Sequence, residues 1–185
     1  MEIRAATLAD IDGLIEIDGT IESTHYLHVE QAGEGVAVSW RLEERAMRSP
    51  SVVSNPIDVR NRFFLRQVLG GANEGVVLAV VRDSTPVAML LAAPTQSDTL
   101  RVIDLRVDSD YRREGIATAL LLMLIGTARE KQLRAVSAET RADNAPMYHL
   151  LPKCGFELAG LDTRRHSNHD LVKESATLLW YASLD

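Results

Sequence analysis

The chain has 185 residues, of which 46% are hydrophobic, and this length and composition fit one globular domain with its own core. A net charge of −6 argues against nucleic acid as a partner and favours a cationic one. The sequence has a single cysteine, no export signal and no apolar run near the ~20 residues that span a bilayer, so we expect a cytoplasmic protein with no membrane partner.

The first 72 residues carry the weakest structural signals. Residues 2–5 alternate like a short strand, and residues 7–18 show helical spacing, with Thr7 as the N-cap and Asp10 in the first turn. Further on, the sequence predicts helices over residues 36–47 and 61–69, which are followed by Pro50 and by Gly70. Between residues 19 and 72 we find no decodable motif.

The middle of the chain predicts three strands of a sheet. Residues 75–81 and 86–92 are nearly continuous in apolar residues and flank a polar turn, so they predict a hairpin that is covered on both faces. Residues 100–107 alternate apolar and polar side chains, which predicts the next antiparallel strand.

The last third of the chain alternates between strand and helix. Residues 134–140 predict a strand, Asp143 or Asn144 caps a helix that runs to about Lys153, and residues 156–161 and 175–183 predict two final strands. These elements predict a single mixed α/β domain of the α+β kind over residues 1–185, with a mostly antiparallel central sheet and helices on both faces.

A loop with a glycine joins the strand at 100–107 to the most apolar helix of the chain. The N-terminus of a helix has unpaired N–H groups and the positive end of the helix dipole, so it can bind an anion such as phosphate. Gly115 and Ala117 are small enough to leave room for the anion, and Arg112 and Arg113 add positive charge. The alternative is an ordinary turn with two solvated arginines, and spacing alone does not separate the two. The helix itself is apolar almost all round up to Arg129, which predicts packing on both sides.

Two blocks of sequence resemble a known family. Val107, Tyr111-Arg112, Gly115-Ile116-Ala117 and the leucine run that follows look like the acyl-coenzyme A loop of the GCN5-related N-acetyltransferase (GNAT) superfamily, although Arg113 stands where the family usually has a glycine. A second block that resembles the family comprises Glu139, Thr140, Asn144, Lys153, Cys154, Gly155 and Phe156. Together with Gly160-Leu161-Asp162, Glu174 and Trp180-Tyr181, this block looks like the streptothricin acetyltransferase branch in particular. The superfamily resemblance covers almost the whole chain, and the branch resemblance covers its last half.

The resemblance implies a splayed sheet that admits the pantetheine arm of acetyl-CoA between the strands at 105–107 and 136–140. Acetyl-CoA would be the cosubstrate, and residues 100–156 would bind it. Residues 19–72 would build the acceptor-binding region. No metal is expected. A backbone N–H near Leu105 would polarise the thioester carbonyl. The cofactor-binding residues implied are Leu105, Arg106, Val107, Arg112, Arg113, Glu114, Gly115, Ile116, Ala117, Thr118, Asn144 and Tyr148.

Acetyl transfer to an amine needs a base, because the attacking amine must be neutral. Asp104 and Glu139 are the two candidates, since each lies on one of the strands beside the expected gap. The alternative is that Asp104 pairs with Arg106, and Glu139 with Arg134 or Arg141. The sequence does not decide between these readings.

The acid that would protonate the leaving thiolate is where the sequence departs from the family. The family's usual tyrosine lies seven residues after the asparagine, and this chain has Leu151 there, followed by Pro152. Tyr148 lies one helical turn earlier, on nearly the same face, so it could deliver a hydroxyl to the same cleft or be a packed aromatic residue.

The sequence thus predicts an acetyl-CoA-dependent N-acetyltransferase that acts by direct attack of a primary amine of a small molecule. Two alternatives remain: acetylation of a protein N-terminus or lysine, and a catalytically weak acyl-CoA-binding regulatory module, which the missing tyrosine supports. The assembly is left open between a monomer and a homodimer.

Overall fold

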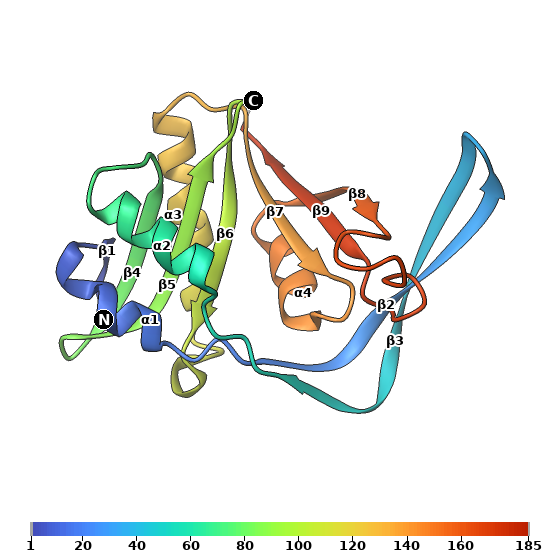
Figure 1. Ribbon diagram of the computed structural model, residues 1–185, viewed down its shortest axis with the longest axis horizontal. Helices are drawn as coiled ribbons and strands as arrows, with labels where there is room; N and C mark the ends of the chain where they lie inside the picture. Colours follow the sequence, from blue (N-terminus) through green and yellow to red (C-terminus); the bar gives the residue numbers. More distant parts are fainter. Residues whose placement is uncertain (1, 185) are drawn as a thin grey trace.

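A seven-stranded sheet in the order β1-β4-β5-β6-β7-β9-β8 runs through the protein, as shown by a computed structural model that describes residues 2–184 (Figure 1). The strands are β1 (Glu2–Ala5), β4 (Val76–Arg82), β5 (Thr85–Pro94), β6 (Thr99–Val107), β7 (Ala135–Arg141), β8 (Glu157–Asp162) and β9 (Thr177–Ser183). Every neighbouring pair is antiparallel except β6 and β7. The predicted mixed domain with a mostly antiparallel sheet is therefore confirmed.

Helices cover both faces of this sheet. On one face, α3 (Ile116–Glu130) and α4 (Ala145–Lys153) bury the larger core cluster, which includes Leu90, Leu120 and Leu151. On the other face, α1 (Ile11–Glu16) and α2 (Val59–Leu69) bury a second cluster around Leu65 and Met89. Because β4 and β5 contribute side chains to both clusters, the prediction that this hairpin is covered on both faces is confirmed.

The parallel strands β6 and β7 stay together over only three residue pairs. Thr99, Leu100 and Arg101 pair with Ala135, Val136 and Ser137. Beyond these pairs the two strands diverge, and Figure 1 shows the gap widening away from the C-terminus. β7 therefore does not pair with residues 102–107 of β6. The predicted splay of the sheet is confirmed.

The predicted helix over residues 36–47 is wrong. These residues belong to β3 (Ala37–Val53), which pairs with β2 (Ile21–Glu34) in a separate two-stranded ribbon. The sequence has apolar residues alternating with polar ones at Val38, Trp40 and Leu42. This period of two is typical of a strand, and the prediction of a helix did not take it into account. The partner strand, with its mixed sequence, supplies the hydrogen bonds that a helix would have made internally.

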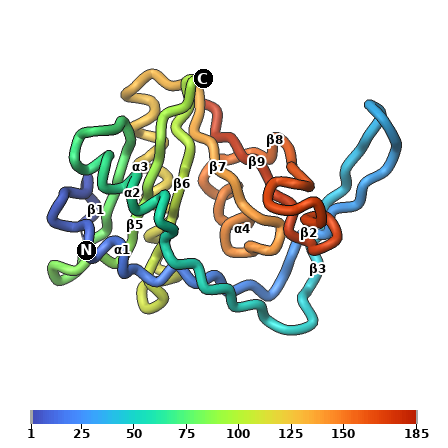
Figure 2. The backbone as a smooth tube through the Cα atoms, viewed as in Figure 1, coloured from blue at the N-terminus to red at the C-terminus, as the bar shows by residue number. Residues whose placement is uncertain are grey.

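The base of this ribbon is fixed to the main sheet, whereas its outer half projects from the body (Figure 2). The N–H of Leu27 donates to the carbonyl of Ala142 at 2.8 Å, and the Ser23 hydroxyl accepts from the first N–H of α4, that of Ala145, at 2.8 Å. The ribbon's base is therefore held against the diverging end of β7 and the start of α4.

The helix α3 packs on one side only, contrary to the expectation from its composition. Leu120 and Leu124 are fully buried against the sheet, but the side chains of Leu122 and Met123 are exposed. The reason is that α3 forms the outer layer of a single sheet, so only its inner side meets another element. No helix within residues 2–184 is long and apolar enough to cross a membrane.

Candidate active site

The loop before α3 has the backbone that an anion site requires. Gly115 is the N-cap of α3 with φ of 80°, a left-handed conformation that favours glycine. A Cβ atom added there would meet no other heavy atom within 4 Å, so the surroundings of Gly115 on that side are open. Arg113 also has a positive φ, 67°, which explains why related loops carry glycine at this position.

The arginines of this loop have different surroundings. Arg112 donates from Nε to the carbonyl of Val107 at 3.0 Å and from Nη2 to that of Asp18 at 3.2 Å, so it ties the loop to β6 and to the segment after α1. Arg113 is exposed, and the neighbouring Glu114 pairs with Arg82 at 3.5 Å. Arg113 is therefore the more accessible of the two arginines.

Asp104 lies on the α1/α2 face of β6 in a buried ion pair. Its carboxylate accepts from Nε of Arg106 at 3.1 Å and also from Nη2, and the two side chains are 9% and 2% exposed. Arg106 also reaches the carbonyls of Ile17 and Asn55, both at 3.4 Å. This pair therefore fastens the segments on either side of the ribbon to β6, which is the structural role that the sequence left as an alternative.

Glu139 lies on the same face of β7, beside the closed end of the splay. Both of its oxygens accept from Nη2 of Arg165 at 3.0 Å, and Nη1 of Arg101 is 4.0 Å away. The partners considered from the sequence are engaged elsewhere, Arg134 with the carbonyl of Ser97 and Arg141 with Asp143. With 32% of its side chain exposed, Glu139 is the more accessible of the two predicted bases.

Tyr148 and Asn144 both lie at the start of α4, next to the ribbon. The Asn144 side chain caps the helix by accepting from the N–H of Met147 at 3.3 Å. The Tyr148 hydroxyl donates to Glu44 on β3 at 2.9 Å, and burial together with this bond raises the pKa of the phenol above its usual value. Leu151, at the family's tyrosine position, is fully buried in the core.

Glu44 is a site residue that the sequence did not reveal. One of its oxygens accepts from Tyr148 and lies 2.6 Å from Nε2 of His149, and the Tyr148 bond is the main reason that the pKa of Glu44 is lowered. The alternation of residues 38–42 could have placed Glu44 on a strand. Nothing local could have linked it to a tyrosine 104 positions away.

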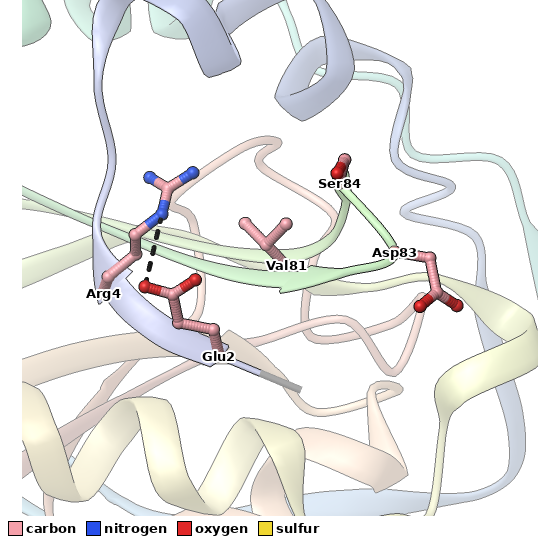
Figure 3. A pocket seen from close by; sticks show the side chains of 5 residues that line it. All are labelled: Glu2, Arg4, Val81, Asp83 and Ser84. Atoms are coloured by element: carbon pink, nitrogen blue, oxygen red, sulfur yellow. Dashed lines mark ion pairs between the residues drawn. The ribbon is translucent and has the colours of Figure 1, made fainter.

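A surface hollow of about 440 Å³ lies away from this region at the β1 edge of the sheet (Figure 3). Its lining includes Glu2 and Arg4, which lie 4.0 Å apart, and Asp83 and Ser84 from the β4–β5 turn. The terminal nitrogens of Arg4 are occupied by Asp10. We therefore assign the site to the gap between β6 and β7 and the loop before α3.

A family model described as "Acetyltransferase (GNAT) family" matches residues 40–156, more than half of the chain. The chain belongs to the GNAT family. The match includes β6, the loop before α3, β7 and all of α4, which are the elements that frame the splay. The resemblance inferred from the two sequence blocks is thereby confirmed.

Similar proteins lie in the streptothricin branch of GNAT proteins. The chain is 29% identical over 87 residues to streptothricin acetyltransferase of Escherichia coli, a match covering 47% of this chain and 50% of that protein. It is 35% identical over 78 residues to streptothricin acetyltransferase A of Bacillus subtilis (strain 168), covering 42% and 44%. The chain thus spans about half the length of the curated relatives it matches.

Solved structures share the fold over nearly the whole chain. The crystal structure of nourseothricin acetyltransferase superimposes with a TM-score of 0.78 at 20% identity, covering 100% of this chain and 98% of that one. A Bacillus anthracis str. Ames protein assigned as a streptothricin acetyltransferase, solved with acetyl coenzyme A, also gives 0.78, at 17% identity and 99% of each chain. At these identities the likeness establishes the fold alone.

Proposed function

We propose that this GNAT protein transfers an acetyl group from acetyl-CoA to a primary amine of a small molecule by direct attack. The observation that carries the proposal is the separation of β6 from β7 beyond Arg101, with the open loop of Gly115 at the end of the same strand. A thioester arm in that gap would lie beside unoccupied backbone groups of residues 102–107, whose N–H groups could stabilise the developing oxyanion.

The loop residues fit the pyrophosphate of coenzyme A. The first turn of α3 has N–H groups without helical partners, and it follows directly on the exposed residues Arg113 and Gly115. Arg112 would act indirectly, by holding the loop against β6. The relative solved with acetyl coenzyme A supports this cosubstrate.

We favour Glu139 as the base, acting through a water, because 32% of its side chain is exposed although both of its oxygens accept from Arg165, whereas the side chain of Asp104 is 9% exposed. Asp104 is already committed to the buried Arg106. Tyr148 is the candidate acid: its phenol is protonated at neutral pH, although its raised pKa makes it a weaker acid than a free tyrosine. To protonate the thiolate, its hydroxyl would have to leave Glu44 for the sulfur.

A second candidate function is an acyl-CoA-binding module with little turnover. It is favoured by the burial of Leu151 at the usual tyrosine position and by the engagement of the Tyr148 hydroxyl with Glu44. A protein acceptor is a further alternative, since the ribosomal-protein-S18-alanine N-acetyltransferase of Escherichia coli shares the fold with a TM-score of 0.66 at 16% identity.

The decisive experiment incubates the protein with acetyl-CoA and a panel of small amines, with peptides in parallel. We expect release of free coenzyme A and the mass of one added acetyl group on at least one small amine. Acetylated peptide with no acetylated small amine would favour the protein acceptor. Tight acetyl-CoA binding without any acetylated product would favour the binding module.

A further inference from the structure

A cavity of about 190 Å³ lies at the closed end of the splay, and Glu139 is the one residue of its lining that enters the chemistry described above. β6, β7, β9 and the turn before β6 line it, on the face opposite α3 and α4. Its walls are mostly polar, with the hydroxyl side chains of Thr99, Ser137 and Tyr181 around the charged pair Arg101 and Glu139. Ligand sites usually enclose ~300–1,000 Å³, so this cavity fits one end of a ligand rather than a whole one.

The charges around the cavity leave one cation without a matching anion. Arg165 neutralises Glu139 through bonds to both carboxylate oxygens. Arg101 is then left with only a distant contact, 4.0 Å, to the same carboxylate, and its Nε is buried with no hydrogen-bond partner among the described residues. Arg134 lies over the Tyr181 ring at 5.9 Å and adds positive charge at the rim. The cavity is therefore locally positive in a chain of net charge −6.

Arg101 lines the cavity with 44% of its side chain exposed, and the planar fork of arginine matches a carboxylate. We propose that Arg101 binds a carboxylate of the acceptor, so that the acceptor is an amine that also carries a carboxylate. This inference rests on the proposed acetyltransferase function and narrows its substrate class.

The position of Arg101 also limits the spacing between the two groups of the acceptor. Arg101 and Leu105 are four residues apart on β6, about 13 Å at the usual rise of a strand. The arginine side chain covers part of this distance, and the acceptor must cover the rest. The amine and the carboxylate should therefore be separated by several carbons, as in lysine or another ω-amino acid, and not by the single carbon of an α-amino acid.

The test compares 6-aminohexanoate with its methyl ester, which keeps the amine and removes the negative charge. We expect kcat/KM of the wild-type protein to be at least about tenfold higher for the acid. Arg101→Gln should abolish this preference by lowering the rate with the acid, while the rate with the ester stays within about twofold. Arg101→Lys, which keeps the charge without the fork, should lie between the two.

Arg164→Gln is the matched control, because Arg164 is exposed in the same loop as Arg165 and its removal changes the net charge equally. This variant should keep the wild-type preference for the acid. Equal rates with acid and ester in the wild type, or an Arg101→Gln loss of the same size with both, would overturn the proposal.

A binding measurement keeps this inference separate from the proposed function. In NMR, 6-aminohexanoate should shift the Nε–H signal of Arg101, assigned by its loss in Arg101→Gln, and the methyl ester should not. A shift without turnover of any amine would refute acetyl transfer and retain the carboxylate site. Turnover of other amines with no shift would refute the carboxylate site and retain acetyl transfer.

Discussion

At the scale of single residues, the site depends on the backbone conformation of Gly115 and on one hydrogen bond of Tyr148. Gly115 supplies the left-handed turn that opens the N-terminus of α3. The Tyr148 hydroxyl is directed to Glu44, an anion from a distant strand, and burial together with this bond raises the pKa of the phenol. Both residues can be tested by substitutions that change little else.

Gly115→Glu should abolish coenzyme A binding while the fold survives. The new side chain enters open space, so it creates no internal clash, but its negative charge faces the phosphates, and the positive φ costs roughly 1 kcal/mol. Gly71→Glu is the matched control, because Gly71 also has a positive φ, 73°, and open surroundings. Calorimetry should show lost affinity for Gly115→Glu alone. Unchanged affinity in a folded Gly115→Glu protein would remove the loop from the site.

Tyr148→Phe should lower kcat by at least about tenfold with little change in coenzyme A affinity, since general acids typically contribute ~10²–10⁴-fold. The substitution removes the hydroxyl and keeps the buried ring. Tyr26→Phe on β2 serves as the control for a tyrosine elsewhere in the ribbon. If Tyr148→Phe turns over at the wild-type rate, the thiolate leaves without a side-chain acid, and the hydroxyl serves only to hold Glu44.

At the scale of secondary structure, the site depends on elements that are fastened together by a few polar contacts. Ser23 and Leu27 attach the ribbon's base to α4 and to the chain after β7. Arg106 and Asp104 attach the segments on both sides of the ribbon to β6. The acceptor-binding region expected at residues 19–72 is thus joined to the framework of the splay at both ends, and its role in acceptor binding stays a prediction.

Asp104→Asn should lower the free energy of unfolding by about 3 kcal/mol, because it leaves the buried Arg106 without its carboxylate.

Glu139→Gln removes a partly exposed carboxylate and should lower the free energy of unfolding by less than about 1 kcal/mol. If Glu139 is the base, kcat of this variant should fall by at least about tenfold. Urea unfolding and steady-state kinetics on both variants separate the roles. A stable Asp104→Asn protein with a severely reduced kcat would restore Asp104 as the base.

At the scale of the whole molecule, the charge distribution is uneven. The net charge of −6 should attract a cationic amine, whereas the cavity at the closed end of the splay is locally positive. An acceptor with a charge of each sign would satisfy both features, with the amine toward the thioester and the carboxylate toward Arg101.

Salt should therefore affect acceptors differently. For a diamine without a carboxylate, kcat/KM should fall as ionic strength rises from about 10 mM to about 100 mM, where the screening length shrinks from ~30 to ~10 Å. For 6-aminohexanoate, which has no net charge, the same change should have a smaller effect. A diamine rate that does not depend on salt would mean that the net charge plays no part in acceptor capture.

Elements that depend on contiguous residues were predictable from the amino-acid sequence. Apolar periodicity was enough to place β4, β5, β6 and α3, and the loop around Gly115 was recognisable because its residues are adjacent in the chain. Local signals failed for β3, whose hydrogen bonds come from a partner strand of mixed sequence, and for the outer side of α3, where composition suggested a second layer that the fold does not supply.

Only the tertiary structure decided which charges meet at the site. Tyr148 reaches Glu44 across 104 positions, Arg106 reaches Asn55 across 51, and Glu139 pairs with Arg165 instead of the arginines nearer in sequence. The physical reason is that an ion pair or hydrogen bond depends on distances of a few ångströms. Those distances are set by how the ribbon, the sheet and α4 pack together, and local propensity carries no information about them.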